Sequence, residues 1–214
     1  MRKHYDEELE QLHELLVDMG NLCQEAIFMA ARILKDSGQS RADIDAKEAA
    51  IDKKEREIEN LCMHLILRQQ PIATDLRRIG AALKMISDME RIGDQAADIA
   101  ELSGWISGSD SQSRIHLWDM AQATVKMVTD SVAAYVTDSL PLARSVMAAD
   151  DVVDGLFEQV KDEIMQMICE RSIDARESLD LLMAAKYFER IGDHAVNIAE
   201  WVVYAVTGSH EGRM

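Results

Sequence analysis

Acidic side chains recur four residues apart at four places in the chain, in the pattern Glu/Asp-x-x-x-Asp. A helix advances about 100° per residue, so two acids in this pattern lie on one helical face, one turn apart. Carboxylate oxygens gathered in this way are the ligands preferred by hard multivalent cations such as Mg²⁺, Mn²⁺, Ca²⁺ and iron. The four pairs are Glu48 and Asp52, Glu90 and Asp94, Asp150 and Asp154, and Glu189 and Asp193.

These acids fall on the same helical faces as apolar side chains. Along one helix, Glu90 and Asp94 continue the line of Ile79, Leu83 and Ile86, which are positions that a helix turns toward a core. A single motif of this kind usually marks a solvated face. Four copies, each in phase with apolar residues, favour metal binding or a shared buried acid cluster over the solvated interpretation.

The acid pairs also match in height along the chain. Asp52 lies 18 residues before Gln70 and Glu90 lies 20 residues after it, so an antiparallel hairpin turning there brings both acids to nearly the same level. An equivalent hairpin in the second half does the same for Asp154 and Glu189. Each half is therefore predicted to hold at least four carboxylates together. Such like charges raise each other's pKa, and a bound cation removes the conflict.

Residues beside the acids have more ordinary interpretations. Gly93 and Gly192 lie between the acids of their motifs, where a missing side chain makes room for a close helix or a metal. His194 is next to an acid, but its counterpart Gln95 is a poor ligand, so a solvated histidine is the favoured interpretation. Arg91 directly follows an acid and is expected to form a surface ion pair of little energetic weight.

The chain is an internal duplication. The segment Glu-Arg-Ile-Gly-Asp at 90–94 recurs at 189–193 after 99 residues, and Asp52 recurs as Asp154 after 102 residues. Self-similarity at a fixed spacing is the signature of repeated structural units. The chain is thus predicted to consist of two halves of about one hundred residues with the same layout.

The predicted fold is all-α, with two tandem three-helix bundles and six long helices. Ala, Leu, Ile and Met are plentiful while aromatic residues make up only 5%, a mixture that loses little side-chain freedom in helices. The first domain is assigned to 1–106 and the second to 107–214, joined by a Ser- and Gly-rich linker at 103–111. The expected caps are Thr74 or Asp75 for the third helix and Asp174 for the last helix. The expected helices span 5–36, 40–69, 72–106, 115–138, 140–170 and 175–207.

Charge and composition exclude several classes of function. The formal net charge of −16 repels nucleic acid and anionic lipid, and suits cations or a basic protein partner. No stretch reaches the length of a membrane-spanning helix, and the polar segment 1–14 does not resemble a signal peptide. Cys23, Cys62 and Cys169 lie far apart without a CxxC motif, as expected for free thiols in a reducing cytoplasm.

The chain resembles the PhoU family from about residue 5 to residue 207. The resemblance rests on the repeated ERIGD segment and on the turn Arg-Gln-Gln-Pro at 68–71, followed by Asp-Leu-Arg at 75–77. It implies multinuclear iron or zinc clusters held by the eight acids of the four motifs. Asp98 and Asn197, one helical turn further on, are weaker candidates. Phe157 stands at the position of the second half that matches Glu55, so the two clusters are expected to differ in metal number.

The resemblance further implies what the protein does and where. It implies a homodimer in the cytoplasm that reaches the membrane only through its partners. These partners are the ATPase of the phosphate ABC transporter and the phosphate sensor histidine kinase. The expected activity is negative regulation of phosphate uptake and of the phosphate-starvation response, without catalysis.

Two other classes stay open. A carboxylate-bridged metal enzyme of the helix-bundle type would need histidine ligands in a Glu-x-x-His motif, and neither half has one at the ligand positions. A metal-free helical adaptor would use the same bundles for protein contacts alone. Metal analysis distinguishes the adaptor from the metal-binding regulator.

Overall fold

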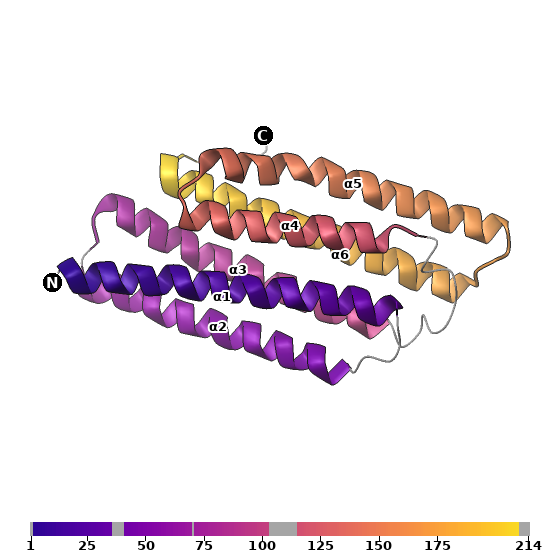
Figure 1. Ribbon diagram of the computed structural model, residues 1–214, viewed down its shortest axis with the longest axis horizontal. Helices are drawn as coiled ribbons and strands as arrows, with labels where there is room; N and C mark the ends of the chain where they lie inside the picture. Colours follow the sequence, from indigo (N-terminus) through magenta and orange to yellow (C-terminus); the bar gives the residue numbers. More distant parts are fainter. Residues whose placement is uncertain (1, 36–40, 70, 103–114, 210–214) are drawn as a thin grey trace.

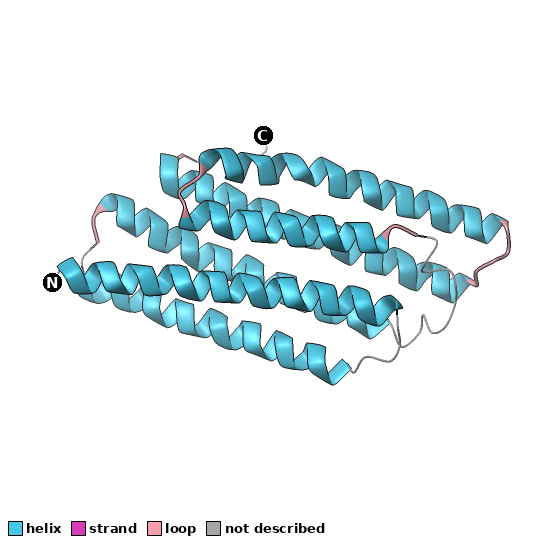
Figure 2. Cartoon of the chain, in the orientation of Figure 1, coloured by secondary structure: helices cyan, strands magenta, loops and turns pink. Residues whose placement is uncertain are grey.

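The computed structural model describes residues 2–35, 41–69, 71–102 and 115–209, and within these ranges every regular element is a helix (Figure 2). The predicted all-α fold is confirmed. The helices are α1 (Arg2–Lys35), α2 (Arg41–Gln69), α3 (Ala73–Leu102), α4 (Leu117–Val136), α5 (Leu140–Cys169) and α6 (Ala175–Thr207). The predicted linker 103–111 and the boundary between the two assigned domains lie outside the described residues.

Local capping explains where the helices of the second half begin and end. The Asp174 side chain accepts hydrogen bonds from the backbone N–H groups of Arg176 and Glu177, which confirms it as the cap of α6. The expected cap of α3 at Thr74 or Asp75 was wrong, because α3 begins at Ala73 and both residues lie in its first turn. Helix α6 stops at Gly208, whose φ of 77° is left-handed and favours glycine. Helix α4 ends two residues before its predicted end because Asp138 also has a positive φ, of 50°, which a helix cannot continue.

The helices form two three-helix bundles lying side by side (Figure 1). Helices α1, α2 and α3 pack on one another, as do α4, α5 and α6, while α3 packs on α6 and α1 on α4 between the bundles. The turn between α2 and α3 and the turn between α5 and α6 lie at opposite ends of the elongated molecule in Figure 1. The carboxylate motifs therefore occupy two separate hairpins.

The contact between α3 and α6 reflects the duplication. Asn197 of α6 donates a hydrogen bond to Asp88 of α3. A shift of 99 residues converts this pair into Tyr187 and Asp98, and the charge of Asp98 does act on the Tyr187 hydroxyl, whose pKa is raised by burial and then by that carboxylate. The two helices run antiparallel, so that matching positions come near one another twice, once as a hydrogen-bonded pair and once as a carboxylate close enough to act on a hydroxyl.

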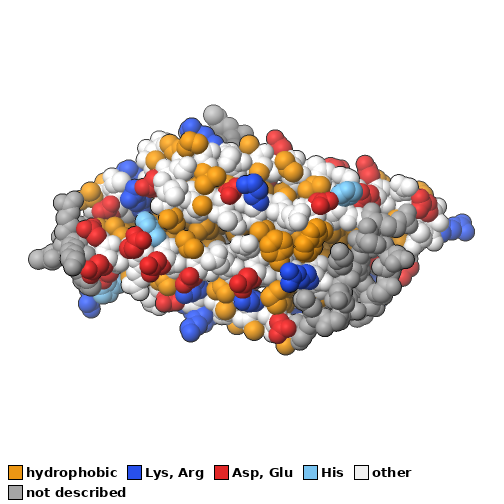
Figure 3. All heavy atoms as spheres, in the orientation of Figure 1, with side chains coloured by type: hydrophobic (Ala, Val, Ile, Leu, Met, Phe, Trp, Pro, Cys, Tyr) orange, Lys and Arg blue, Asp and Glu red, His pale blue; other side chains and the backbone are white. Residues whose placement is uncertain are grey.

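Buried side chains from both bundles form one continuous hydrophobic core. Its largest fully buried members include Phe188, Leu16 and Ile51. On the face shown in Figure 3, acidic side chains are spread along α1 and apolar atoms appear between α1 and α4, where the Phe28 and Trp118 rings lie 5.8 Å apart. In the described part of the chain, no helix combines the length and apolar character needed to span a membrane.

Candidate metal centre

The hairpin of α2 and α3 brings the first set of predicted acids together. Burial raises the pKa of Glu48, and the carboxylates of Asp94 and Asp52 raise it further. Burial likewise raises the pKa of Glu90, followed by the charge of Asp94, with smaller contributions from Glu55 and Asp52. These mutual effects cross from one helix to the other, which is the arrangement that the matched heights predicted.

The acid cluster extends by one turn in both directions. Burial and then Asp94 raise the pKa of Asp98, and burial and then Asp52 raise that of Glu55. Asp98 was a weaker candidate from sequence, and the structure brings it to the same place as the motif acids. Glu55 was considered only as the position that the second half lacks. Sequence spacing could have included it, since it lies three residues beyond Asp52.

A polar cavity of about 310 Å³ opens on this cluster between α2 and α3. Glu48, Asp94 and Asp98 line it, together with Gln95. Gln95 is only 4% exposed, and its Oε1 atom has no hydrogen-bond partner. A buried acceptor without a donor costs about 1–3 kcal/mol, and a cation in the cavity would satisfy it. The structure thus places the Gln95 amide oxygen beside the acids, which the identity of the residue alone did not indicate.

Three arginines supply positive charge around the cluster: Arg91, Arg56 and also Arg41, which lines the cavity and is paired with Asp45 and Glu101. Arg91 Nη1 lies 2.8 Å from Asp94 Oδ2 and Arg91 Nε lies 3.3 Å from Glu90 Oε2. Arg56 Nη2 lies 3.5 Å from Asp52 Oδ2. The Arg91 and Arg56 side chains are 59% and 73% exposed, so these ion pairs are weak and a multivalent cation can displace them.

The donor set of the first cluster fits a hard cation, and ligation would require side chains to turn inward. As they lie, no group of three His, Cys, Asp or Glu residues within the described ranges is arranged to hold one ion. Releasing Arg91 from Asp94 frees one carboxylate that lines the cavity, and releasing Arg41 frees Asp45 and Glu101. Their oxygens, with the Gln95 amide oxygen, then provide the all-oxygen environment that Mg²⁺, Mn²⁺ or iron accepts.

Glycines at the centre of both motifs admit the neighbouring helix. A Cβ atom on Gly93 would lie 2.9 Å from Ile51 Cδ1, and one on Gly192 would lie 3.4 Å from Val153 Cγ1. The prediction that these glycines make room for a close helix is confirmed. The approach is tighter in the first half than in the second.

The second set of motif acids is arranged differently. Asp150 is buried, at 4% exposure, and its Oδ1 faces Gly192 at 3.7 Å from where a Cβ would be. Glu189 is paired with Lys186. Asp154 and Asp193 are exposed, contrary to the expectation that all the acids continue the core-facing stripe. With two of its four motif acids exposed, this cluster fits a multivalent cation less well than the first.

Asn197 and His194 serve the contact between the two bundles. Asp88 Oδ1 accepts a hydrogen bond from Asn197 Nδ2 at 3.0 Å and lies 2.9 Å from His194 Nδ1. Interpreting His194 as solvated was wrong, since its side chain is 19% exposed. Sequence alone could not reveal this contact because Asp88 lies outside the acid motifs. The amide nitrogen of Asn197 is already engaged away from its own motif.

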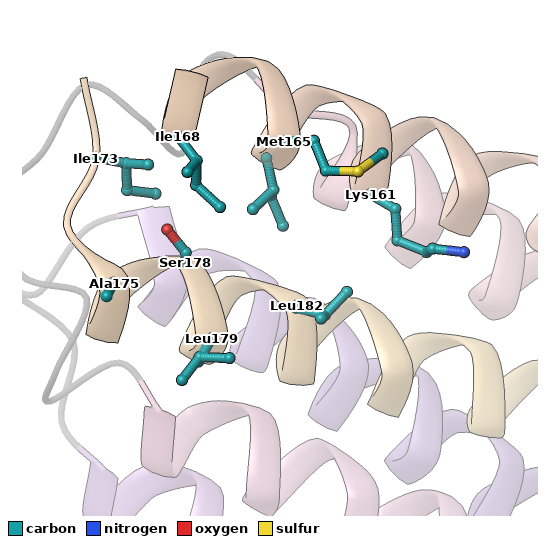
Figure 4. Close-up of a pocket in the computed structure, with 9 residues that line it drawn as sticks. Lys161, Met165, Ile168, Ile173, Ala175, Ser178, Leu179 and Leu182 are labelled. Atoms are coloured by element: carbon teal, nitrogen blue, oxygen red, sulfur yellow. The ribbon is translucent and has the colours of Figure 1, made fainter. Parts of the chain in front are cut away.

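The tip of the second hairpin carries an apolar groove of about 460 Å³ (Figure 4). Met165 and Ile168 from α5 face Leu179 and Leu182 from α6 across it, and Lys161 lies at one end. Met165, Ile168 and Leu179 are 53%, 49% and 63% exposed. Sequence analysis did not predict this surface, although exposed apolar residues next to a hairpin turn are a signal for it.

Comparison with known proteins gives matches along nearly the whole chain. The model of the PhoU domain matches twice, at residues 16–103 and 117–202. A phosphate-specific transport system accessory protein PhoU homolog from Clostridium acetobutylicum is 35% identical over 97% of this chain and 96% of its own length. A PhoU homolog 1 from Thermotoga maritima is 32% identical over 97% of this chain and 90% of its own length.

Solved structures agree with the sequence matches. The crystal structure of PhoU from Pseudomonas aeruginosa superposes with a TM-score of 0.87 at 30% identity, covering 96% of this chain and all of the other. The phosphate transport system regulatory protein PhoU from Streptococcus pneumoniae has a TM-score of 0.86 at 24% identity, which supports the shared fold.

Proposed function

The chain belongs to the PhoU family, and from this premise we propose that it is a regulatory accessory protein of phosphate transport. It restrains phosphate uptake and the phosphate-starvation response when phosphate is plentiful. The observation that carries this proposal is the match of two PhoU domains across relatives of nearly equal length that are named as phosphate transport accessory proteins. The regulator acts by binding other proteins and performs no catalysis.

Its partners in this proposal are the ATPase of the phosphate ABC transporter and the phosphate sensor histidine kinase. In this proposal the protein works in the cytoplasm, where both partners can be reached. It is a homodimer and reaches the membrane only through these partners. The net charge of −16 supports a partner surface rich in Lys and Arg, because opposite charges steer association. The same charge opposes binding to nucleic acid.

The apolar groove at the tip of the second hairpin is the part of the surface assigned to the transporter contact. Its exposed Met and Leu side chains suit an apolar segment of the partner, and the net negative charge of the whole chain favours a basic partner. Methionine adapts to the shape of a binding partner. The substitution Met165→Glu places a charge inside the groove and should abolish binding of the transporter there.

The first carboxylate cluster is assigned to a multivalent cation, and iron or zinc is the choice that the family resemblance favours. Support comes from the crowded acids, the polar cavity and the unpaired Gln95 oxygen. The metal in this proposal is structural or regulatory. A metal enzyme of the bundle type is less well supported, because the described residues that line the cavity include no histidine.

Capture of the tagged protein from cells grown in rich phosphate tests the function. We expect the transporter ATPase to be retained by the parent and by Val17→Glu, a control at an exposed apolar position on α1, and to be lost with Met165→Glu. Metal analysis of the same samples separates the metal-binding regulator from the metal-free adaptor. Capture without any component of phosphate transport or signalling would contradict the proposal.

A further inference from the structure

The two carboxylate clusters differ in the charges that surround them, although their backbones are related by duplication. A shift of 102 residues relates α5 to α2, and a shift of 99 residues relates α6 to α3. Glu55 and Glu59 of the first half thereby correspond to Phe157 and Lys161 of the second. Ser87 corresponds to Lys186.

These exchanges change the balance of charge. At the compared positions the first half has seven carboxylates and one guanidinium group, and the second half has four carboxylates and three cationic side chains. The full sets are Glu48, Asp52, Glu55, Glu59, Ser87, Glu90, Arg91, Asp94 and Asp98 in the first half, and Asp150, Asp154, Phe157, Lys161, Lys186, Glu189, Arg190, Asp193 and Asn197 in the second.

The structure brings the exchanged residues of the second half together. The Nζ atoms of Lys161 and Lys186 each lie 5.5 Å from the centre of the Phe157 ring, within the range of a cation–π interaction. Lys186 also forms the ion pair with Glu189, and only 16% of the Glu189 side chain is exposed. The Lys186 ammonium group, on a side chain that is 44% exposed, thus lies beside the motif glutamate and over the Phe157 ring, while Lys161 is also paired with Glu158.

No ammonium group stands at any of the compared positions of the first half. The cations near its cluster are the exposed guanidinium groups of Arg91 and Arg56, and that of Arg41, which lines the cavity and is paired with Asp45 and Glu101. It also has the buried Gln95, whose Oε1 lacks a partner and which lines the cavity with the acids. The residue at the matching position of the second half, His194, faces Asp88 of the other bundle instead.

We infer that the chain binds multivalent cation in its first half only, with Gln95 as an additional oxygen ligand, and that Lys186 supplies the compensating charge in the second half. This inference rests on the proposed cation site of the first cluster. Lys186 and a multivalent ion compete for the same carboxylate, because bringing both next to Glu189 places like charges together. The duplicated fold therefore has one cation-dependent hairpin and one that is neutralised by its own side chains.

Titration of the full, chelator-treated chain with Mn²⁺ tests the inference, with bound ion counted by electron paramagnetic resonance and heat by calorimetry. Three variants accompany the parent: Glu48→Gln with Glu90→Gln in the first half, the matched Asp150→Asn with Glu189→Gln in the second, and Phe157→Glu with Lys161→Glu and Lys186→Ser. At these three positions, the last variant gives the second half the residues of the first. Circular dichroism verifies that each variant is folded.

We expect the first-half variant to lose tight Mn²⁺ binding, with at least a tenfold rise in Kd, and the matched second-half variant to retain the parent stoichiometry. The exchange variant should gain Mn²⁺ binding in its second half. The single change Lys186→Ser provides an independent measurement: its melting temperature should become more dependent on Mn²⁺ than that of the parent.

Equal losses of Mn²⁺ in the first- and second-half variants would overturn the inference while leaving a metal-binding regulator in place. A parent that binds no Mn²⁺ would overturn the cation site of the proposed function and the inference with it. An exchange variant that is folded and gains no Mn²⁺ would show that Lys186 and Lys161 are not what limits the second half.

Discussion

Crowded carboxylates in the first cluster should make the metal-free protein sensitive to pH. Burial and neighbouring acids raise the folded-state pKa of Glu48, Glu55, Glu90 and Asp98. A raised folded pKa means that the folded chain binds more protons than the unfolded chain between the two pKa values. The contribution to the free energy of unfolding is thus largest at low pH, and is lost as pH rises through the folded pKa.

We predict that Glu48→Gln with Glu90→Gln flattens this dependence in the metal-free protein. His13 acts in the opposite direction, since burial lowers its pKa, so the measured quantity is the difference between parent and variant. Urea unfolding between pH 4 and pH 7 should show the variant gaining stability over the parent as pH rises. A constant difference would mean that the acids are solvated independently.

Replacing Gln95 tests the part of the cation site that was missed from sequence. Gln95→Leu removes the amide oxygen and keeps a buried side chain of similar size, so it should weaken Mn²⁺ binding by about tenfold without loss of folding. It should also relieve the unpaired acceptor and stabilise the metal-free chain. Calorimetric titration and thermal melting measure both effects. Unchanged Mn²⁺ affinity would remove Gln95 from the site.

The sequence predicted the positions of the motif acids in the first hairpin better than the roles of the residues beside them. The helical spacing placed Glu48, Asp52, Glu90 and Asp94 together because periodicity within a helix is set by backbone geometry. It could not place Gln95, whose role depends on how closely α2 approaches α3. The pair of Lys186 with Glu189 was open to prediction from sequence, because the two residues lie three positions apart on one helix and therefore share a face.

At the scale of elements, replacing each motif glycine with alanine tests how tightly its hairpin is packed. Gly192→Ala should stabilise the metal-free chain by about 1 kcal/mol through helix propensity, because the added Cβ meets its nearest neighbour at an ordinary contact distance. Gly93→Ala meets Ile51, which is fully buried, and overpacking there costs about 1–3 kcal/mol. Gly93→Ala should therefore be the less stable of the two.

Urea unfolding midpoints of the two metal-free variants decide this comparison. Equal midpoints would mean that Ile51 shifts freely and that the two hairpins are equally tight.

The helices themselves were predicted closely from sequence, with α5 and α6 beginning at the expected residues, because Ser139 and Asp174 act as local caps. The antiparallel contact of α3 with α6 was not predicted, since periodicity does not specify which bundle faces meet.

At the scale of the whole molecule, duplication has produced two bundles with one common core and unequal chemistry. The first hairpin carries the acids and the polar cavity, and the second carries the apolar groove at its tip. This division suits a regulator in which a cation-stabilised bundle supports a protein-binding bundle. The hydrogen bond from Asn197 to Asp88 joins the bundles through α6 and α3.

The central claim is that this chain restrains phosphate uptake, and deletion of its gene with regulated re-expression tests it most directly. Transcripts of the phosphate-uptake genes are measured in rich phosphate in the parent strain, in the deletion strain, and after return of the parent chain or of Met165→Glu. The account predicts high transcript levels in the deletion strain, restored repression with the parent chain, and failure of Met165→Glu to restore it. Transcript levels in the deletion strain that equal those of the parent strain in rich phosphate would contradict the account.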